Sequence, residues 1–212
     1  MNPWRRRRHK GKQMANTSTK IVLILFLLLA GVAGIIYSGV YNVGADVPHS
    51  RLVFGLLDQV RERSVANHAR GISAPRDLSD PKRISAGAGL YAEMCAGCHL
   101  APGIEPTEIS RGLYPSAPEL ARGDDLSAAE QFWTIKHGIK STAMPAWGKT
   151  HSDELIWDMV AFVRQLPTLS PARYKALVAS APEDHEEMMK GMEQGHGGEA
   201  QQADSHPDEH HR

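Results

Sequence analysis

The chain has 212 residues, 42% of them hydrophobic, and its 24 Lys and Arg residues equal its 24 Asp and Glu residues. The neutral total conceals three parts. Residues 1–45 carry seven basic and no acidic residues, residues 46–180 carry fifteen of each sign, and residues 181–212 carry nine acidic and two basic residues. The balanced middle part has no charge excess that would indicate a partner, and we expect no nucleic-acid partner.

The N-terminal part combines a basic cluster with a long uncharged run. Residues 1–20 hold all seven basic residues, and residues 21–43 hold no charge. As a helix these 23 residues would rise about 34 Å, enough to cross a hydrocarbon core of about 30 Å. Tyr37 and Tyr41 lie near the exit, where aromatic side chains favour the interface. We therefore predict a transmembrane anchor over 21–43, with residues 1–20 as a basic cytoplasmic segment.

A cleaved signal peptide is the alternative for the same segment. Val43, Gly44 and Ala45 resemble a small-residue cleavage site. The apolar run is longer than the usual core of a signal peptide, which favours a retained anchor. Under either interpretation, the rest of the chain is exported from the cytoplasm. We expect a single-pass protein of the bacterial inner membrane with its main domain in the periplasm.

Residues 46–79 are predicted to form a helix followed by an extended connector. Ser50 can cap a helix that runs to about Ala69, and Gly71 would end it. The apolar positions repeat at helical spacing and form a stripe: Leu52, Val53, Leu56, Leu57 and Val60. The stripe fits a surface helix packed on the following domain. The sharper hypothesis is a partner-docking helix close to the membrane.

Three further helices are predicted within residues 80–180. Asp80 and Pro81 provide an N-cap and a first-position proline for a helix that runs into the region of the cysteines. A second helix spans about 127–137, and a third spans about 152–165 with most of its apolar side chains on one face. No alternating strand pattern of useful length is visible. The prediction is an all-α fold with long loops.

The chain has two cysteines, Cys95 and Cys98, and the second is followed directly by His99. Cys-x-x-Cys-His is the attachment motif of a c-type haem. Positions i and i+3 share one face of a helix, so two thiols there can reach the two vinyl groups on one edge of a porphyrin. The adjacent histidine can then bind the iron from one side of the ring. We predict one covalently attached haem c.

Other uses of a Cys-x-x-Cys pair agree less well with the sequence. A thioredoxin-like redox pair needs a βαβ frame, which is not visible. A zinc site needs a second pair of ligands in a second knuckle. A disulfide across two residues would close a very tight loop and stabilise little. A bound haem also accounts for the long loops, because a large apolar cofactor replaces core that the chain does not supply.

The second axial ligand of the iron decides the chemistry of such a site. Five side chains are candidates: Met94, Met144, Met159, His137 and His151. Met94 points the wrong way, and Met159 lies inside a helix, where core packing is the ordinary role of methionine. Met144 lies in a Met-Pro loop 45 residues after His99, enough chain to wrap around the haem edge. Met144 is the preferred ligand, with a packed loop methionine as the alternative.

Four pieces of the chain carry a family resemblance: Gly87 and Tyr91 ahead of the cysteine motif; Ala117, Pro118, Glu119 and Leu120; His137 with Met144, Pro145 and Trp147; and the aromatic terminal helix. Residues 80–167 resemble a class I cytochrome c. Within that class they are similar to the small haem domains related to the third subunit of cbb3-type oxidases. We therefore place a cytochrome c domain at residues 80–180, preceded by one transmembrane helix.

The resemblance implies Met144 as the sixth ligand and a hydrogen bond from His99 to the Pro118 carbonyl, which would fix the imidazole. It also implies that Gly87 allows a close crossing with the last helix near Trp157. The implied residues of the haem pocket are Pro118, Leu120 and Trp147. For the tryptophan, an ordinary core aromatic is the alternative.

A haem with histidine on one face and methionine on the other has no open position for a substrate, and a thioether ligand raises the reduction potential. We predict an electron carrier rather than an enzyme. It would be a membrane-tethered, periplasmic monohaem cytochrome that passes single electrons between respiratory or dehydrogenase partner proteins. One alternative is a fixed electron-transfer subunit of a dehydrogenase or terminal oxidase complex. A haem peroxidase or gas sensor is less favoured.

Residues 181–212 form an acidic tail that is rich in histidine and methionine. We predict that it is a disordered, solvating segment. The alternative is loose binding of copper or another periplasmic metal through imidazole and thioether groups. The side chains in question are His185, His196, His206, His210, His211, Met188, Met189 and Met192.

Overall fold

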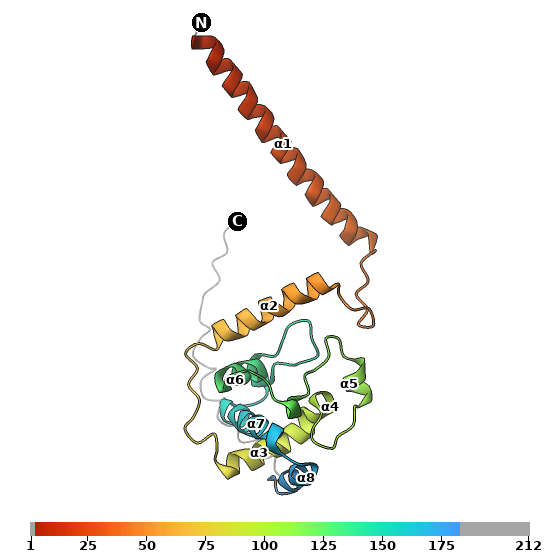
Figure 1. The fold of residues 1–212 in the computed structure, drawn as a ribbon, viewed down its shortest axis with the longest axis vertical. Helices are drawn as coiled ribbons and strands as arrows, with labels where there is room; N and C mark the ends of the chain where they lie inside the picture. The colour runs from red at the N-terminus through yellow and green to blue at the C-terminus, as the bar shows by residue number, and fades with distance from the viewer. Residues whose placement is uncertain (1–2, 183–212) are drawn as a thin grey trace, which may run out of the picture. The chain divides into compact units, whose positions relative to one another are not determined.

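The computed structural model describes residues 3–182, and residues 3–16 by their backbone alone. Every regular element of the described residues is a helix (Figure 1), which confirms the predicted all-α fold. The chain divides into two compact units, Met1–Val47 and Pro48–Arg212. The predicted tail lies outside the described residues except for its first two positions.

The first unit contains one helix, α1 (Pro3–Ser38). Its segment Thr17–Ser38 has a mean hydropathy of 2.7 over 22 residues and is long and apolar enough to cross a membrane. The helix ends five residues before the predicted limit of 43. Gly39 adopts a φ of +63°, a left-handed conformation that commonly follows the last turn of a helix. The predicted helix over 21–43 was therefore too long at its C-terminal end.

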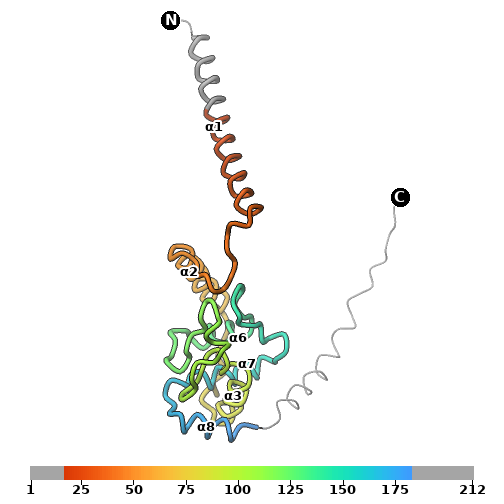
Figure 2. Tube along the Cα trace, turned by 90° about the vertical axis from the view of Figure 1, so that its right-hand side faces the viewer, coloured from red at the N-terminus to blue at the C-terminus, as the bar shows by residue number. Residues whose placement is uncertain are grey.

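The second unit contains the other helices. They are α2 (Arg51–His68), α3 (Pro81–Met94), α4 (Ala96–His99), α5 (Glu108–Gly112), α6 (Ala128–His137), α7 (Asp153–Gln165) and α8 (Pro171–Ala179). Short 3-10 turns occur at Leu120–Arg122, Trp147–Lys149 and Leu166–Thr168. The predicted starts of four helices are confirmed, because Ser50, Asp80, Ser127 and Ser152 each accept a backbone hydrogen bond at an N-cap. Helices α2 and α8 lie at opposite ends of this unit in both ribbon views (Figures 1 and 2).

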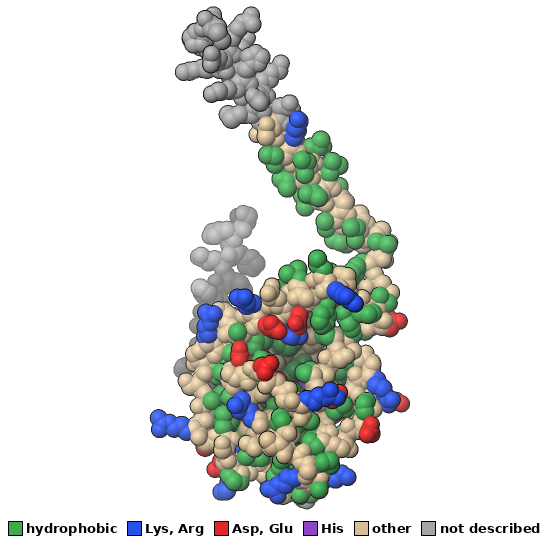
Figure 3. Space-filling view, viewed as in Figure 1, with side chains coloured by type: hydrophobic (Ala, Val, Ile, Leu, Met, Phe, Trp, Pro, Cys, Tyr) green, Lys and Arg blue, Asp and Glu red, His purple; other side chains and the backbone are tan. Residues whose placement is uncertain are grey.

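Helix α2 lies against α6, where the ring of His68 stacks on that of Trp133 with centroids 5.4 Å apart. Val65 and Ala69 are buried. The predicted apolar stripe of α2 is not the packed surface, since its side chains are exposed apart from the half-buried Val53 (Figure 3). The interpretation of that stripe as the contact with the domain was wrong, because the C-terminal end of the helix makes the contact.

Helices α3 and α7 cross closely and form the centre of the domain. A Cβ atom at Gly87 would overlap the carbonyl of Asp158, so only glycine allows this approach. Helix α7 buries most of its length, and its apolar residues divide between two clusters. One cluster contains Tyr91 and Phe162, with ring centroids 5.2 Å apart, and the other contains Phe132 stacked on Trp157 at 4.2 Å. The predicted close crossing is confirmed.

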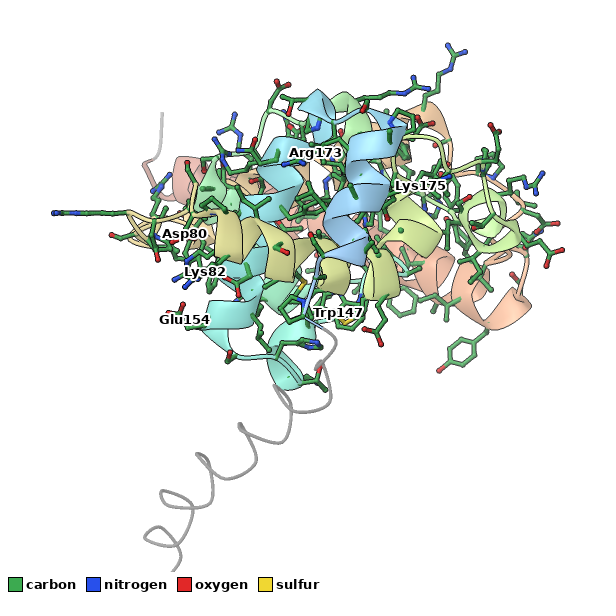
Figure 4. The ribbon with its side chains drawn as sticks, turned by 90° about the horizontal axis from the view of Figure 1, so that it is seen from below. Asp80, Lys82, Trp147, Glu154, Arg173 and Lys175 are labelled. Carbon is green, nitrogen blue, oxygen red and sulfur yellow. The ribbon has the colours of Figure 1, made fainter. Side chains whose placement is uncertain are left out.

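One arginine joins the connector before α3 to both central helices. Arg83 donates to Asp77 at 3.0 Å, to Glu154 at 2.8 Å and to Asp158 at 2.7 Å. Its bond to Glu154 contributes most to raising the pKa of the guanidinium, which therefore stays charged. Figure 4 labels Asp80 at the start of α3 and Glu154 at the start of α7. The ion pairs fix these two helix starts relative to each other.

Candidate haem site

The two cysteines lie on one helical turn, which breaks from α3 at Cys95. The amide of Cys95 still donates to the Tyr91 carbonyl at 2.9 Å, and the amide of His99 donates to the Cys95 carbonyl at 2.9 Å. Cys95 and Cys98 are both free thiols and both half-buried. The turn therefore presents two thiols and one imidazole within five consecutive residues, as the motif predicts.

The protonation of the Cys95 thiol argues against a thiol–disulfide redox pair. Burial, with a smaller contribution from the neighbouring Cys98, raises the pKa of Cys95 to about 12. Reactive redox cysteines have lowered pKa values, because the thiolate is the nucleophile. No strand is present in residues 3–182 to supply the frame of a thioredoxin-like fold. The pair is better suited to permanent attachment than to exchange.

His99 is oriented through its first ring nitrogen. Its Nδ1 lies 2.8 Å from the carbonyl oxygen of Pro118, so the hydrogen bond that the resemblance implies is present. Burial lowers the pKa of the imidazole, although the bond to Pro118 acts in the opposite direction. A neutral ring that donates through Nδ1 keeps its Nε2 lone pair for a metal. The backbone of Pro118 therefore selects the tautomer that a metal ligand needs.

Two further hydrogen bonds hold the turn, and the sequence analysis did not identify either. The Tyr91 hydroxyl donates to the Leu100 carbonyl at 2.5 Å, and Leu100 adopts a positive φ of 59°. The Thr107 hydroxyl donates to the Gly97 carbonyl at 2.6 Å. Both bonds end on backbone carbonyls, so no sequence motif reveals them.

Met144 lies in a loop that is closed by its own backbone. Gly138 has a φ of +62°, and a Cβ there would meet the carbonyls of Met144 and Pro145. The Ile139 amide donates to the Met144 carbonyl at 3.3 Å, and the Met144 amide donates to the Thr142 hydroxyl at 3.1 Å. These contacts fold residues 138–144 into a compact loop with Met144 near its end.

The other candidate axial ligands make different contacts within the domain. Met159 is fully buried in the second apolar cluster, and Met94 packs against that cluster. His137 is exposed and its ring packs on Trp133, while His151 is buried with its Nδ1 2.9 Å from the Thr150 hydroxyl. Met144 is half-buried and belongs to neither apolar cluster of the described residues. Of the three candidate methionines, Met144 is the one that does not pack in either apolar cluster of the described residues.

The three predicted pocket residues come from two segments. Pro118 and Leu120 flank the start of a 3-10 turn, and Leu120 packs against the first apolar cluster. Trp147 is half-buried, and its ring meets that of His151 edge-on at 5.4 Å. Figure 4 shows its position in the domain. The structure does not bring Trp147 into contact with Pro118 or Leu120 through any apolar cluster of residues 17–182.

The donor set fits a c-type haem. Two thiols one turn apart suit thioether attachment, and an imidazole with its Nδ1 committed to a carbonyl suits axial ligation. Residues 82–163 match the family model described as cytochrome C oxidase, cbb3-type, subunit III. These residues form a cytochrome c domain of that family.

The match lies inside the span of the resemblance, residues 80–167, and ends short of the predicted domain limit at 180. No curated protein and no solved structure is matched by the chain. The cofactor of this family is a covalently attached haem c, and the chain offers only two cysteines to hold it. The cytochrome domain is accordingly a module for electron transfer.

Proposed function

We propose that the chain is a membrane-tethered, single-haem electron carrier. Cys95 and Cys98 hold the haem covalently, and His99 and Met144 bind its iron. The observation that carries the proposal is the His99 Nδ1 contact with the Pro118 carbonyl at 2.8 Å, directly beside the two thiols. It leaves the second ring nitrogen as the free donor in the one place where a haem can be attached.

In the proposed carrier, His99 and Met144 would hold the iron of the bound haem. The Pro118 carbonyl keeps the imidazole of His99 in one tautomer and one orientation. The closed loop that ends at Met144 carries the thioether as the second ligand. The haem, when bound, supplies the one-electron couple, and two protein ligands leave no position for a substrate. An iron that would keep the same two protein ligands in both oxidation states is suited to electron transfer rather than to catalysis.

The first unit of the chain supports the proposed location. Thr17–Ser38 serves as the anchor, and the basic residues that precede it remain in the cytoplasm. The cytochrome domain then lies in the periplasm of a bacterial cell. Its partners are redox proteins of the same membrane or compartment, which meet the haem at a high effective concentration.

A fixed electron-transfer subunit of a larger complex is the second candidate function. The family description favours it, because the proteins that define the family are a subunit of an oxidase. Purification from native membranes in mild detergent separates the two functions. A carrier elutes alone, whereas a subunit elutes with one partner in constant ratio at every step.

The ligand assignment is tested by the absorption spectrum of the oxidised protein. Methionine ligation gives a weak far-red band, and replacing Met144 with alanine should abolish it while the haem stays attached. Met94→Leu is the matched control, because that side chain also lies beside the haem motif yet is not a proposed ligand. An unchanged far-red band in Met144→Ala contradicts the assignment, and a high-spin spectrum of the native protein indicates a peroxidase or gas sensor instead.

A further inference from the structure

Helix α2 exposes a set of large apolar side chains that no part of the domain covers. Four of them are between 51% and 79% exposed: Leu52, Leu56, Leu57 and Val60. They gather over the N-terminal part of the helix (Figure 3), whereas Val65 and Ala69 near its other end are buried. We call these four residues the α2 stripe. A soluble domain seldom leaves such a row of leucines uncovered.

The acidic residues of α2 lie away from this stripe, whereas one basic residue lies beside it. At 3.6 residues per turn, Leu52, Leu56 and Val60 follow one another along one side of the helix. Asp58 and Glu62 then lie about 200° and about 240° around the axis from Leu56, so both acids point away from the stripe. Arg63 lies within about 20° of the line through Leu56. The side of α2 that carries the stripe is apolar, and Arg63 brings positive charge to it.

The chain keeps α2 within reach of a membrane if α1 spans one. Twelve residues separate Ser38, the last residue of α1, from Arg51, the first of α2. Fully extended, they reach at most about 43 Å. A weakly binding surface held at that distance from lipid is present at a high effective concentration. Basic side chains beside an apolar face are also what anionic lipid headgroups attract.

We propose that the α2 stripe lies in the headgroup region of the periplasmic leaflet and fixes the cytochrome domain on the bilayer surface. The occupant is an anionic lipid bilayer. The apolar side chains of the stripe insert among the headgroups, and Arg63 binds the anionic headgroups beside them. The proposal rests on the proposed membrane tether. It adds that the tethered domain has one preferred face toward the lipid, the face that carries α2.

The test compares two cysteine variants of the full-length protein in nanodiscs of phosphatidylethanolamine and phosphatidylglycerol, loaded with one copy per disc. Leu56→Cys places a thiol in the α2 stripe, and Glu62→Cys places one on the other side of the same helix. Both native side chains are exposed. A water-soluble maleimide should alkylate Leu56→Cys about tenfold more slowly than Glu62→Cys, because lipid shields the first thiol alone.

Alkylation is read at each residue by peptide mass spectrometry, so the result does not depend on whether Cys95 and Cys98 carry haem. Equal rates at the two positions overturn the proposal. Protection of Leu56→Cys that appears only in discs with two copies also overturns it, because a second chain is then the occupant. A chain that does not enter discs overturns the tether as well, whereas equal rates in an inserted chain leave the proposed electron carrier intact.

Discussion

His99 and Met144 lie in segments that the domain holds by different means. The turn with His99 is bonded outward, to Pro118 through its imidazole and to Thr107 through the Gly97 carbonyl. The loop with Met144 is bonded mainly to itself, through Ile139 and Thr142. The first proposed ligand is therefore positioned by hydrogen bonds to other segments of the domain, and the second proposed ligand by hydrogen bonds within its own loop. We therefore expect the loop with Met144 to open before the turn with His99 when the domain is destabilised.

The largest effect should come from removing the two ligands in turn. His99→Ala should lower the yield of haem-loaded protein about tenfold or more, because the oriented imidazole holds the iron during assembly. Met144→Ala should keep its haem but lower the reduction potential by on the order of 0.1 V. Haem-stained gels and redox titration measure the two results. Equal haem loss in both variants would contradict the difference between the two sides.

The crossing of α3 and α7 supports the His99 side. Gly87→Val would drive its side chain into the carbonyl of Asp158, and we expect it to destabilise the domain by about 2–4 kcal/mol. Gly97→Val is the matched control, since a Cβ at Gly97 meets nothing within 4 Å. Thermal unfolding followed by circular dichroism measures both. A similar melting temperature for the two variants would show that the crossing can widen at little cost.

Weakening the hydrogen bonds within the loop that carries Met144 should affect the proposed ligation by Met144 and leave the turn with His99 unchanged. Thr142→Val removes the hydroxyl that donates to the Ile139 carbonyl at 2.8 Å and accepts from the Met144 amide. A loss of about 1 kcal/mol would raise the affinity of the iron for added imidazole about fivefold. Thr168→Val, which removes a comparable bond to Gln165, is the control and should leave imidazole binding unchanged. Spectral titration with imidazole distinguishes them.

The smallest effect should be an acid sensitivity at the start of α6, the helix that leads into the Met144 loop. Hydrogen bonds from Ser127 lower the pKa of Glu130. A carboxylate with a lowered folded pKa stabilises the protein above its unfolded pKa, and this contribution is lost as the pH falls through the folded value. Wild type should exceed Glu130→Gln in stability by less than about 1 kcal/mol at pH 7, and the difference should shrink as the pH falls through the folded pKa of Glu130. Melting curves over a series of acid pH values measure the difference, and a constant difference would contradict the assignment.

The helices that the sequence predicted well are those with an N-cap and a long apolar face. Helices α3, α6 and α7 each begin after a capping Asp or Ser and bury their apolar side chains. Helix α8 has the same kind of start at Ser170 and Pro171 but is only nine residues long, too short for a clear periodic pattern. The end of α1 was misplaced because hydropathy continues to 43 while the backbone turns at Gly39.

The site was predictable where a side chain carries the signal and not where the backbone does. Cys95, Cys98 and His99 stand out by type and spacing alone. The acceptors at Gly97 and Leu100 are carbonyls, which every residue has, so their partners Thr107 and Tyr91 appear only in three dimensions. The exposure of the α2 stripe was likewise not predictable, because periodicity marks an apolar face without showing what lies against it.

The placement of α8 has a consequence for the acidic, His-rich segment that follows it. Helix α8 lies at the end of the domain opposite α2, and the described chain ends three residues after that helix, at Pro182 (Figure 2). If α2 rests on lipid, the whole height of the cytochrome domain separates the root of that segment from the headgroups.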